Sequence, residues 1–558
     1  MRSLSVAVAV ALCASALSAQ KPGASPDQAE KQSAPCRVSG RVVNATEGAP
    51  IKSAQVVLEQ ENAKRKAGVF GATTDQDGRF EIKSVPPGRY RFFAAHAGFI
   101  SQQYQAKATE SGALLSLAPG QEVTDVLFRL VRAAVITGHV TDESGEPMLS
   151  VSVSVLRKLT ADEKEDWGQR GKKDRLFASA TAITDDRGDY RLFGLKPGEY
   201  YVKAADTSNP PYYSDQDPLW MVRRALGNSY APLYYPGVIQ LGQAETVKLR
   251  AGEEMQADFE MRHIKTVEVS GRVVAADGGP ATHTYVQLLT PDEDDWSDEL
   301  GSSTDSKGEF SIKGVPPGSY VLSAQQHDQE KRYMTRMKLD VGNEKVDSLT
   351  ISFGRGTTIS GRIVLADSRA TGVDRMHVSL SSVSEDDDMA GFAWAEVKKD
   401  GTFQIADVAD GRYSLHVMGM EQGWFVKSAR LGGEDVTQRG VQVERGNSGG
   451  SLEVVLSSAS AQLDGSVTDH DKPVVGAQVR ARPDPVTPYN RHRSRSATTD
   501  QNGQFAFDDL PPGKYRVLAK LPSAAPEVPP VSSEPQVVTL SEHDHQSVKF
   551  VLEASTPE

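Results

Sequence analysis

Residues 73–90 have the sequence TTDQDGRFEIKSVPPGRY, and the pattern in this stretch decides the fold of the chain. The pattern recurs five times in 558 residues, and in every copy two glycines stand ten positions apart. These pairs are Gly78 and Gly88, Gly188 and Gly198, Gly308 and Gly318, Gly401 and Gly411, and Gly503 and Gly513. Because chance would not fix this spacing five times, the chain is built from internal repeats.

The first half of the pattern predicts a hairpin turn followed by a strand. The Asp75 side chain can accept hydrogen bonds from the backbone ahead of it, and Gly78 can adopt a positive φ. Apolar residues then alternate with polar ones, as at Phe80 and Ile82. A period of two indicates a strand with one buried face.

Further strand signals surround this turn in each copy. Pro87 and Gly88 suit a type II turn, and a second alternating stretch begins at Tyr90. The copy opens with a strand-like stretch at 38–42 and closes with another at 123–128. The other copies repeat this order and show almost no helical periodicity. We therefore predict an all-β chain of five tandem seven-stranded β-sandwiches.

These motifs resemble the carboxypeptidase regulatory-like domains. The similarity rests on Ser-Gly-Arg-Val at 39–42, the Thr-Asp-x-x-Gly-x-Phe turn at 74–80 and Pro-Pro-Gly-x-Tyr at 86–90, and with the repeats it covers nearly all of 36–558. The resemblance implies prealbumin-like, or Ig-like, sandwiches related in shape to starch-binding and Cna B-type modules. It says little about function, because such modules serve as spacers, adhesins and sugar-binding units.

The fourth copy departs most from the pattern. Lys398 stands in the place of the turn aspartate, and Ala-Asp-Gly at 409–411 replaces Pro-Pro-Gly. The apolar alternation is intact at Phe403 and Ile405, so we expect the same fold there.

The repeat divides the chain into a leader region and five domains. The predicted segments are a signal peptide at 1–19, a flexible leader at 20–35, and sandwiches at 36–133, 134–264, 265–355, 356–459 and 460–558. Several domains are expected at this length, because one hydrophobic core stops growing at roughly 250–300 residues. Each unit starts almost directly after the last closing strand, and such short linkers predict a semi-rigid rod of domains, whose inter-domain angles the sequence leaves open.

The N-terminus is typical of a secretory signal. Arg2 supplies a positive charge, residues 4–17 form a short apolar stretch, and cleavage near Ala19 is plausible. We therefore predict a secreted, periplasmic or cell-surface protein. After cleavage only Cys36 remains, so an internal disulfide cannot form.

Composition bears on the possible partners. The formal net charge is −12 and no basic face dominates, so nucleic acid is not expected to bind. No stretch after the signal has the roughly 20 apolar residues needed to span a membrane, so membrane insertion is not expected either.

Three motifs suggest chemistry, and each has a simpler explanation. Residues 446–450, GNSGG, match a serine nucleophile motif but occupy the turn before a closing strand. His327 and Glu330 have a zinc-ligand spacing without a convincing third ligand. Asp75 and Asp77 could contact calcium, but arginine or lysine replaces Asp77 in two copies. We predict no catalytic residue, no metal, no cofactor and no enzymatic activity.

The second copy carries an aromatic insertion at 205–240, which is the first candidate binding site. Its aromatic residues are Tyr212, Tyr213, Trp220, Tyr230, Tyr234 and Tyr235. Flat aromatic faces bind the apolar faces of sugars and also anchor protein interfaces. The alternative is that these rings pack the long loop onto its own sandwich.

Charged loops are the second candidate. The loop after the second strand is acidic in the middle copies and basic in the end copies. The acidic stretches are 162–166, 292–295 and 385–388, and the basic residues are Lys64, Arg65, Lys66, Arg491, Arg493 and Arg495. These loops are either a solvated surface or the contacts of a weak head-to-tail self-association.

Two hypotheses about function therefore stay open. The first is a non-catalytic, exported structural rod that binds a cell-envelope protein in the manner of an adhesin. The second is a carbohydrate-binding protein that recognises a glycan or cell-envelope polysaccharide through the aromatic insertion of the second domain.

Overall fold

The computed structural model describes residues 34–61, 68–106, 112–159, 176–206, 229–275, 277–290, 300–327, 332–353, 356–366, 372–383, 392–444, 450–521 and 531–552. In these ranges the regular structure is β-strand apart from short 3₁₀ turns such as η1 (Leu241–Gln243) and η2 (Val373–Arg375). The prediction of an all-β chain is confirmed. The described residues include no helix long and apolar enough to cross a membrane.

The strands form pairs of sheets, and each pair encloses a large hydrophobic cluster. We number these units sandwich 1 to sandwich 5 along the chain. Sandwich 1 contains β1 (Cys36–Asn44), β2 (Gln55–Gln60), β3 (Val69–Thr73), β4 (Arg79–Val85), β5 (Gly88–Ala95), β6 (Gln102–Gln103), β7 (Leu114–Leu117) and β8 (Glu122–Leu130). Sandwich 2 contains β9 (Ala134–Thr141), β10 (Val151–Lys158), β11 (Leu176–Ile183), β12 (Asp189–Leu195), β13 (Gly198–Asp206), β14 (Ser229–Tyr230), β15 (Leu233–Tyr234), β16 (Val247–Leu249), β17 (Glu254–Gln256), β18 (Phe259–Glu260) and β19 (His263–Ile264).

The remaining strands continue in the same order. Sandwich 3 contains β20 (Val267–Val274), β21 (Tyr285–Leu289), β22 (Gly301–Ser303), β23 (Glu309–Val315), β24 (Gly318–His327), β25 (Arg332–Val341) and β26 (Val346–Ser352). Sandwich 4 contains β27 (Thr357–Leu365), β28 (His377–Ser382), β29 (Phe392–Glu396), β30 (Thr402–Val408), β31 (Gly411–Met418), β32 (Phe425–Leu431), β33 (Glu434–Asp435), β34 (Val441–Val443) and β35 (Leu452–Ser457). Sandwich 5 contains β36 (Ala461–Asp469), β37 (Lys472–Pro473), β38 (Gln478–Pro483), β39 (Arg495–Thr498), β40 (Gln504–Leu510), β41 (Gly513–Leu521), β42 (Val531–Ser532), β43 (Gln536–Leu540) and β44 (His545–Val551).

The opening strand of each copy is the centre of one sheet, here called the outer sheet. In sandwich 1, β1 pairs antiparallel with β4 and parallel with the closing strand β8. Sandwich 3 repeats this with β20 between β23 and β26, and its second sheet has four strands. The predicted seven strands therefore describe sandwich 3. Among the described residues, the other sandwiches add short edge strands such as β6 and β37, and sandwich 2 adds a separate two-stranded sheet of β14 and β19.

The repeated hairpin turn has the predicted geometry. Asp75 Oδ1 accepts hydrogen bonds from the backbone N–H groups of Asp77 at 2.9 Å and Arg79 at 2.8 Å. Gly78 has a φ of 73°, and a Cβ at this position would lie 2.5 Å from the Val42 carbonyl oxygen. The same side-chain bonds recur at Asp185, Asp305 and Asp500. They lower the pKa of the Asp185 and Asp305 carboxyls, because hydrogen bonds favour the charged form.

The Pro-Gly segment differs from its prediction. Gly88 has a φ of 155°, whereas a type II turn needs a φ near +80° at this position. The type II assignment is therefore wrong, because Gly88 is already the first residue of β5. The Tyr90 hydroxyl donates to the Pro86 carbonyl at 2.7 Å and fastens this connection. The equivalent hydroxyls of Tyr200, Tyr320, Tyr413 and Tyr515 also donate to the carbonyl four residues earlier.

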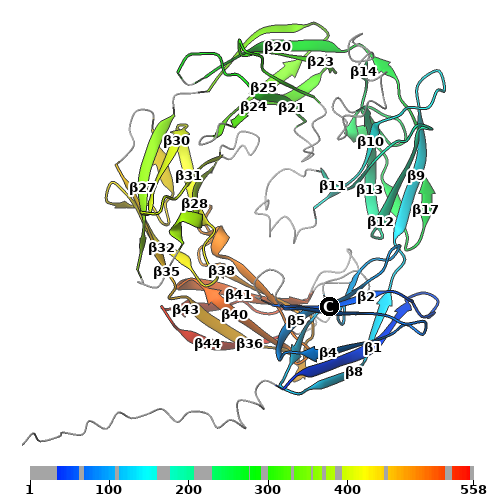
Figure 1. Cartoon of the computed structure of the whole chain (residues 1–558), viewed down its shortest axis with the longest axis vertical. Helices are drawn as coiled ribbons and strands as arrows, with labels where there is room; N and C mark the ends of the chain where they lie inside the picture. The colour runs from blue at the N-terminus through cyan, green and yellow to red at the C-terminus, as the bar shows by residue number, and fades with distance from the viewer. Residues whose placement is uncertain are drawn as a thin grey trace, which may run out of the picture.

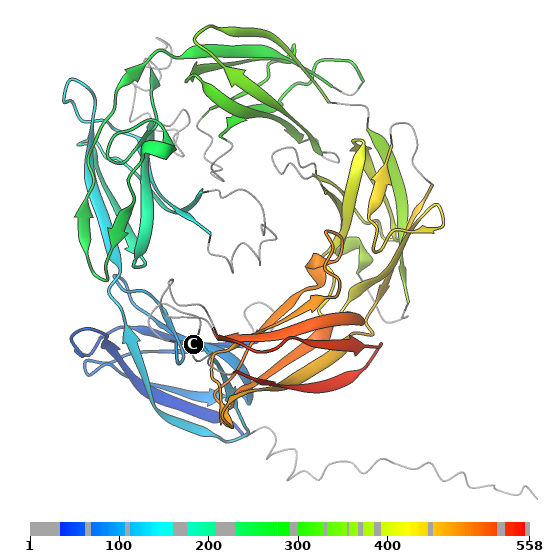
Figure 2. The same cartoon turned by 180° about the vertical axis from the view of Figure 1, so that it is seen from behind.

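The sandwiches do not form the predicted rod. Figures 1 and 2 show them arranged as a closed ring in which sandwich 5 returns to sandwich 1. Leu114 of β7 and Asp500 of sandwich 5 form an isolated parallel β-bridge across this junction. The rod prediction failed because short linkers limit the distance between neighbours but do not set the angle at each junction.

Candidate functional site

The described part of the aromatic insertion is largely internal. Tyr230 is buried in the core of sandwich 2, and its ring centroid lies 4.2 Å from that of His263. Tyr234 is buried beside Leu156 and Leu176. Tyr235 is half-buried and packs, like Tyr230, against the main core of sandwich 2. Tyr212, Tyr213 and Trp220 lie outside the described residues, so the sugar-binding prediction for those three stays a prediction.

The other candidates predicted from the sequence are the charged loops, the nucleophile-like motif and possible metal ligands. The charged stretches 64–66, 162–166, 292–295 and 385–388, and Ser448 of the nucleophile-like motif, lie outside the described residues. Of the basic residues of sandwich 5, Arg493 contacts sandwich 4 of the same chain, and Arg495 pairs with Asp509 of sandwich 5 itself. Arg493 Nη2 donates to the Val426 carbonyl at 2.8 Å, and burial lowers the pKa of this guanidinium. In the described ranges no three His, Cys, Asp or Glu side chains gather as metal ligands would.

The junction between sandwiches 5 and 1 is built from one turn and one strand. Ser116 of β7 donates its hydroxyl to Asp500 Oδ2 at 2.6 Å. Its backbone N–H donates to Gln501 Oε1 at 2.9 Å, and its carbonyl accepts from Gln501 Nε2 at 2.7 Å. The Gln501 amide thus pairs with both backbone groups of Ser116 as a neighbouring strand would. The repeated hairpin turn of sandwich 5, which contains Asp500 and Gln501, therefore also joins sandwich 5 to sandwich 1.

This junction lies on the outer sheet of sandwich 5. A groove of about 480 Å³ forms there between the two sandwiches. Sandwich 5 contributes Asp464, Ser466 and Lys549, and sandwich 1 contributes Arg89 and Ser116. The outer face of sandwich 5 is therefore a contact surface for another part of the chain.

Sandwich 4 has a wider outer sheet than its neighbours. The strand after β31, β32, pairs with the closing strand β35 and continues into the hairpin with β33. In sandwich 3 the corresponding strand, β25, pairs with β24 in the second sheet. The change of sheet gives sandwich 4 the strand order β30-β27-β35-β32-β33.

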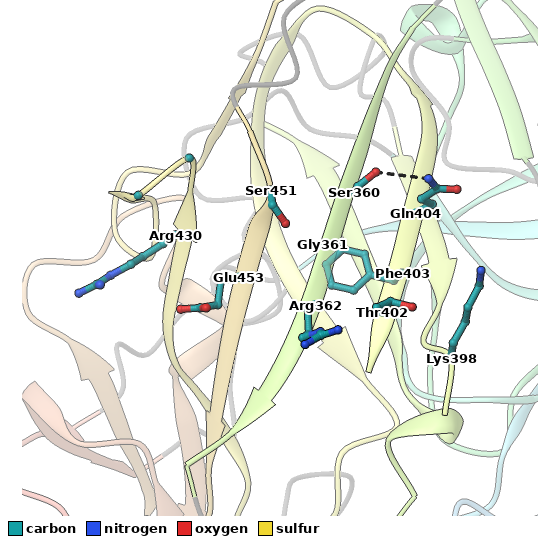
Figure 3. Close-up of a pocket in the computed structure, with 12 residues that line it drawn as sticks. Ser360, Gly361, Arg362, Lys398, Thr402, Phe403, Gln404, Arg430, Ser451 and Glu453 are labelled. Carbon is teal, nitrogen blue, oxygen red and sulfur yellow. Dashed lines mark hydrogen bonds between the residues drawn. The ribbon is translucent and has the colours of Figure 1, made fainter. Parts of the chain in front are cut away.

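A groove of about 770 Å³ lies on this widened sheet. Figure 3 shows its side chains on neighbouring strands, with Arg430 at one margin, Lys398 at the other and Arg362 between them. The lining residues are Ser360, Gly361, Arg362, Lys398, Thr402, Phe403, Gln404, Arg430, Gly432, Gly433, Ser451 and Glu453. The charged side chains are all exposed, so a ligand could reach them.

Strand register places the charges of the groove in one row. Arg362 pairs with Thr402 on one side and Glu453 on the other, and Glu453 pairs with Arg430. Neighbouring strands are about 4.8 Å apart, so the two arginines stand roughly 10 Å apart across Glu453. With Lys398 the groove holds three cations and one carboxylate. It therefore attracts anions, although the whole chain is acidic.

Arg362 is oriented differently from its counterparts. In sandwiches 1 and 3 the equivalent arginines donate Nε to a carbonyl of the hairpin turn, Arg41 to Asp77 at 2.7 Å and Arg272 to Lys307 at 3.1 Å. Within the described ranges Arg362 makes no such bond, and its charge contributes, after the Thr402 hydrogen bonds, to the lowered pKa of Asp400. Its guanidinium donors are thus available to a ligand.

Comparison with known proteins establishes the family. Residues 37–126, 135–262, 268–352 and 462–553 match the carboxypeptidase regulatory-like domain, which is more than half of the chain. The chain belongs to this family, and the matched ranges leave out sandwich 4. The modules of this family are a non-catalytic type of fold. No curated protein matches the chain significantly.

Solved structures give weaker likenesses. A streptococcal ancillary pilin is 11% identical, covers 57% of this chain and 97% of its own, and has a TM-score of 0.18. The minor pilin of Streptococcus agalactiae is 14% identical over 41% of this chain and 96% of its own, with a TM-score of 0.20. The Bacillus anthracis TIE protein is 11% identical over 90% and 68%, with a TM-score of 0.14. At such TM-scores these likenesses carry no argument about function.

Sequence reasoning missed the groove residues Arg362, Arg430 and Glu453. The available signal was the departure of the fourth copy, in which Lys398 replaces the turn aspartate. Asp400 takes over the turn, because its Oδ1 accepts from the Thr402 hydroxyl at 2.6 Å and from the Thr402 N–H at 3.0 Å. These bonds, the hydroxyl first, lower the pKa of Asp400. The backbone of Lys398 keeps the turn bonds to Gly401 and Thr402, but its side chain is not needed for the turn and can be a cation.

Proposed function

We propose that this protein is an exported, non-catalytic scaffold that acts by binding a component of the cell envelope. The observation that supports it best is the junction at Ser116, where Asp500 and Gln501 join the last sandwich to the first. A chain whose ends are joined in this way holds five outer faces in a fixed order around a ring. Such a framework suits presentation of surfaces to partners rather than chemistry at one site.

Contacts at other junctions support the same framework. The Arg132 guanidinium lies 5.7 Å from the centre of the Phe99 ring at the passage from sandwich 1 to sandwich 2. Lys427 of sandwich 4 forms a 2.6 Å ion pair with Glu542 of sandwich 5. Export follows from the signal-like residues 1–19, and the partner is a protein or polysaccharide of the envelope.

Electron microscopy of the purified full chain tests the scaffold. Particles should appear as closed rings, and Gln501→Ala should convert a large share of them to open arcs, because it removes both amide contacts to Ser116. Gln76→Ala is the matched control, since Gln76 occupies the same turn position in sandwich 1 and is exposed. Open arcs in the unaltered protein would contradict the ring.

Cell fractionation tests export separately. The full chain should be recovered outside the cytoplasm of the producing cell, and deletion of 1–19 should retain it inside. Cytoplasmic recovery of the chain with an intact N-terminus would contradict the proposal.

A further inference from the structure

The outer groove of sandwich 4 differs from the equivalent surface of sandwich 5 in what covers it. The face of sandwich 5 receives Arg89 and Ser116 from sandwich 1. All the residues that line the groove of sandwich 4 belong to sandwich 4 itself. Arg362 and Arg430 lie in one register row, and Lys398 lies at the far margin.

We propose that this groove binds a carboxylated polysaccharide. The charge favours an anion, because three cations face one carboxylate there. Guanidinium groups pair with carboxylates through two parallel hydrogen bonds, and Arg362 and Arg430, which lie on strands one strand apart, can each pair with a carboxylate of one polymer chain. This assignment deepens the proposed scaffold function and rests on it, since an envelope polysaccharide is met only outside the cytoplasm.

The polar neighbours of the cations suit sugar hydroxyls. Gln404 and Ser360 form one side of the groove and Ser451 and Glu453 the other, and together they offer both donors and acceptors. Gly432 and Gly433 leave the margin beside Ser451 without side chains. A long polymer can therefore lie across the sheet.

An acidic peptide is the less favoured occupant. Peptides gain much of their affinity by adding a strand to an exposed sheet edge through backbone hydrogen bonds. The groove lies on the face of β27 and β35, whose backbone groups are already paired within the sheet on both sides. Recognition here must come from side chains, which favours a ligand that carries its own hydroxyl and carboxylate groups.

Binding to polygalacturonate tests the assignment. The intact protein is applied to immobilised polygalacturonate near 0.15 M salt, with neutral dextran and polyglutamate as comparison surfaces. Binding to polygalacturonate alone is expected. Arg362→Gln and Arg430→Gln should each weaken it about tenfold, the usual value of one hydrogen bond to a charged group. Arg375→Gln is the matched control, because it removes the same charge from an exposed site of sandwich 4 outside the groove.

Several outcomes would overturn the assignment. These are no binding to polygalacturonate, equal binding to polyglutamate, and an equal loss in Arg375→Gln. All three substitutions lie on the surface, and unchanged thermal melting confirms that the variants fold. Ring closure is judged by microscopy without any ligand. Failure of the binding assay would therefore overturn the ligand assignment without affecting the test of the scaffold.

Discussion

The outer faces of sandwiches 4 and 5 share one framework and differ in charge at three corresponding positions. Arg362, Glu453 and Lys398 of sandwich 4 correspond to Ser466, Lys549 and Asp500 of sandwich 5. Asp500 contributes to closing the ring by accepting from Ser116, whereas the described residues that line the groove with Arg362 and Lys398 all belong to sandwich 4. The comparison shows that the repeat fixes the sheet and the outward side chains decide what the sheet contacts.

Substitutions in the shared framework should destabilise both sandwiches more than substitutions elsewhere on the two faces. Gly361 and Gly465 face the core, and a Cβ at either would overlap a carbonyl oxygen of the parallel strand and the ring of Phe403 or Phe505. Gly361→Ala and Gly465→Ala should therefore each lower the free energy of unfolding of their own sandwich by about 3 kcal/mol. Urea denaturation measures this.

The control for these two variants is Gly342→Ala. Nothing lies within 4 Å of a Cβ at Gly342, so its effect should stay below about 0.5 kcal/mol. A large difference between Gly361→Ala and Gly465→Ala would show that the two sheets do not share a framework.

The next largest effect is expected at the junction with sandwich 1, which involves the face of sandwich 5 and not that of sandwich 4. Asp500→Ala removes the turn bonds of sandwich 5 and the acceptor for Ser116, so it should weaken the ring junction by about 2 kcal/mol. Asp305→Ala removes the same turn bonds from sandwich 3 and touches no junction contact. Small-angle scattering should show a longer maximum dimension only for Asp500→Ala. The same expansion in both variants would mean that the turn, not the junction, sets the shape.

A smaller, pH-dependent effect is expected between sandwiches 4 and 5. The ring centroids of His416 and His492 lie 4.9 Å apart at this junction. Burial, and then the nearby Arg491, lower the pKa of His416 below its ordinary value of 6.5. The unfolded chain therefore binds this proton more readily, so the stabilisation is present above pH 6.5 and lost as pH falls below it.

Thermal melting at pH 7.5 and pH 5 measures this effect. The melting temperature should drop on acidification, and His416→Gln should make the drop smaller. If His416→Gln melts with an unchanged pH dependence, other groups titrate at the junction.

Much of the fold was predictable because its signals are local. The Asp75 turn depends on residues two and four positions ahead, and the alternation at Phe80 and Ile82 assigns a buried face without knowledge of the partner strand. The aromatic insertion was harder to interpret. Aromatic composition alone does not separate a buried ring such as Tyr230 from an exposed one. Prediction of the type II turn failed because Gly88 belongs to the strand.

The sequence by itself determined the repeat, the all-β class, the hairpin turns and the departure of the fourth copy at Lys398. Tertiary structure alone decided that β32 joins the outer sheet of sandwich 4 and that Gln501 meets Ser116 across 385 residues. The physical reason is that alternation specifies which side of a strand is buried but not which sheet it joins. The angles between successive sandwiches depend on side-chain contacts that form only once the whole chain has folded.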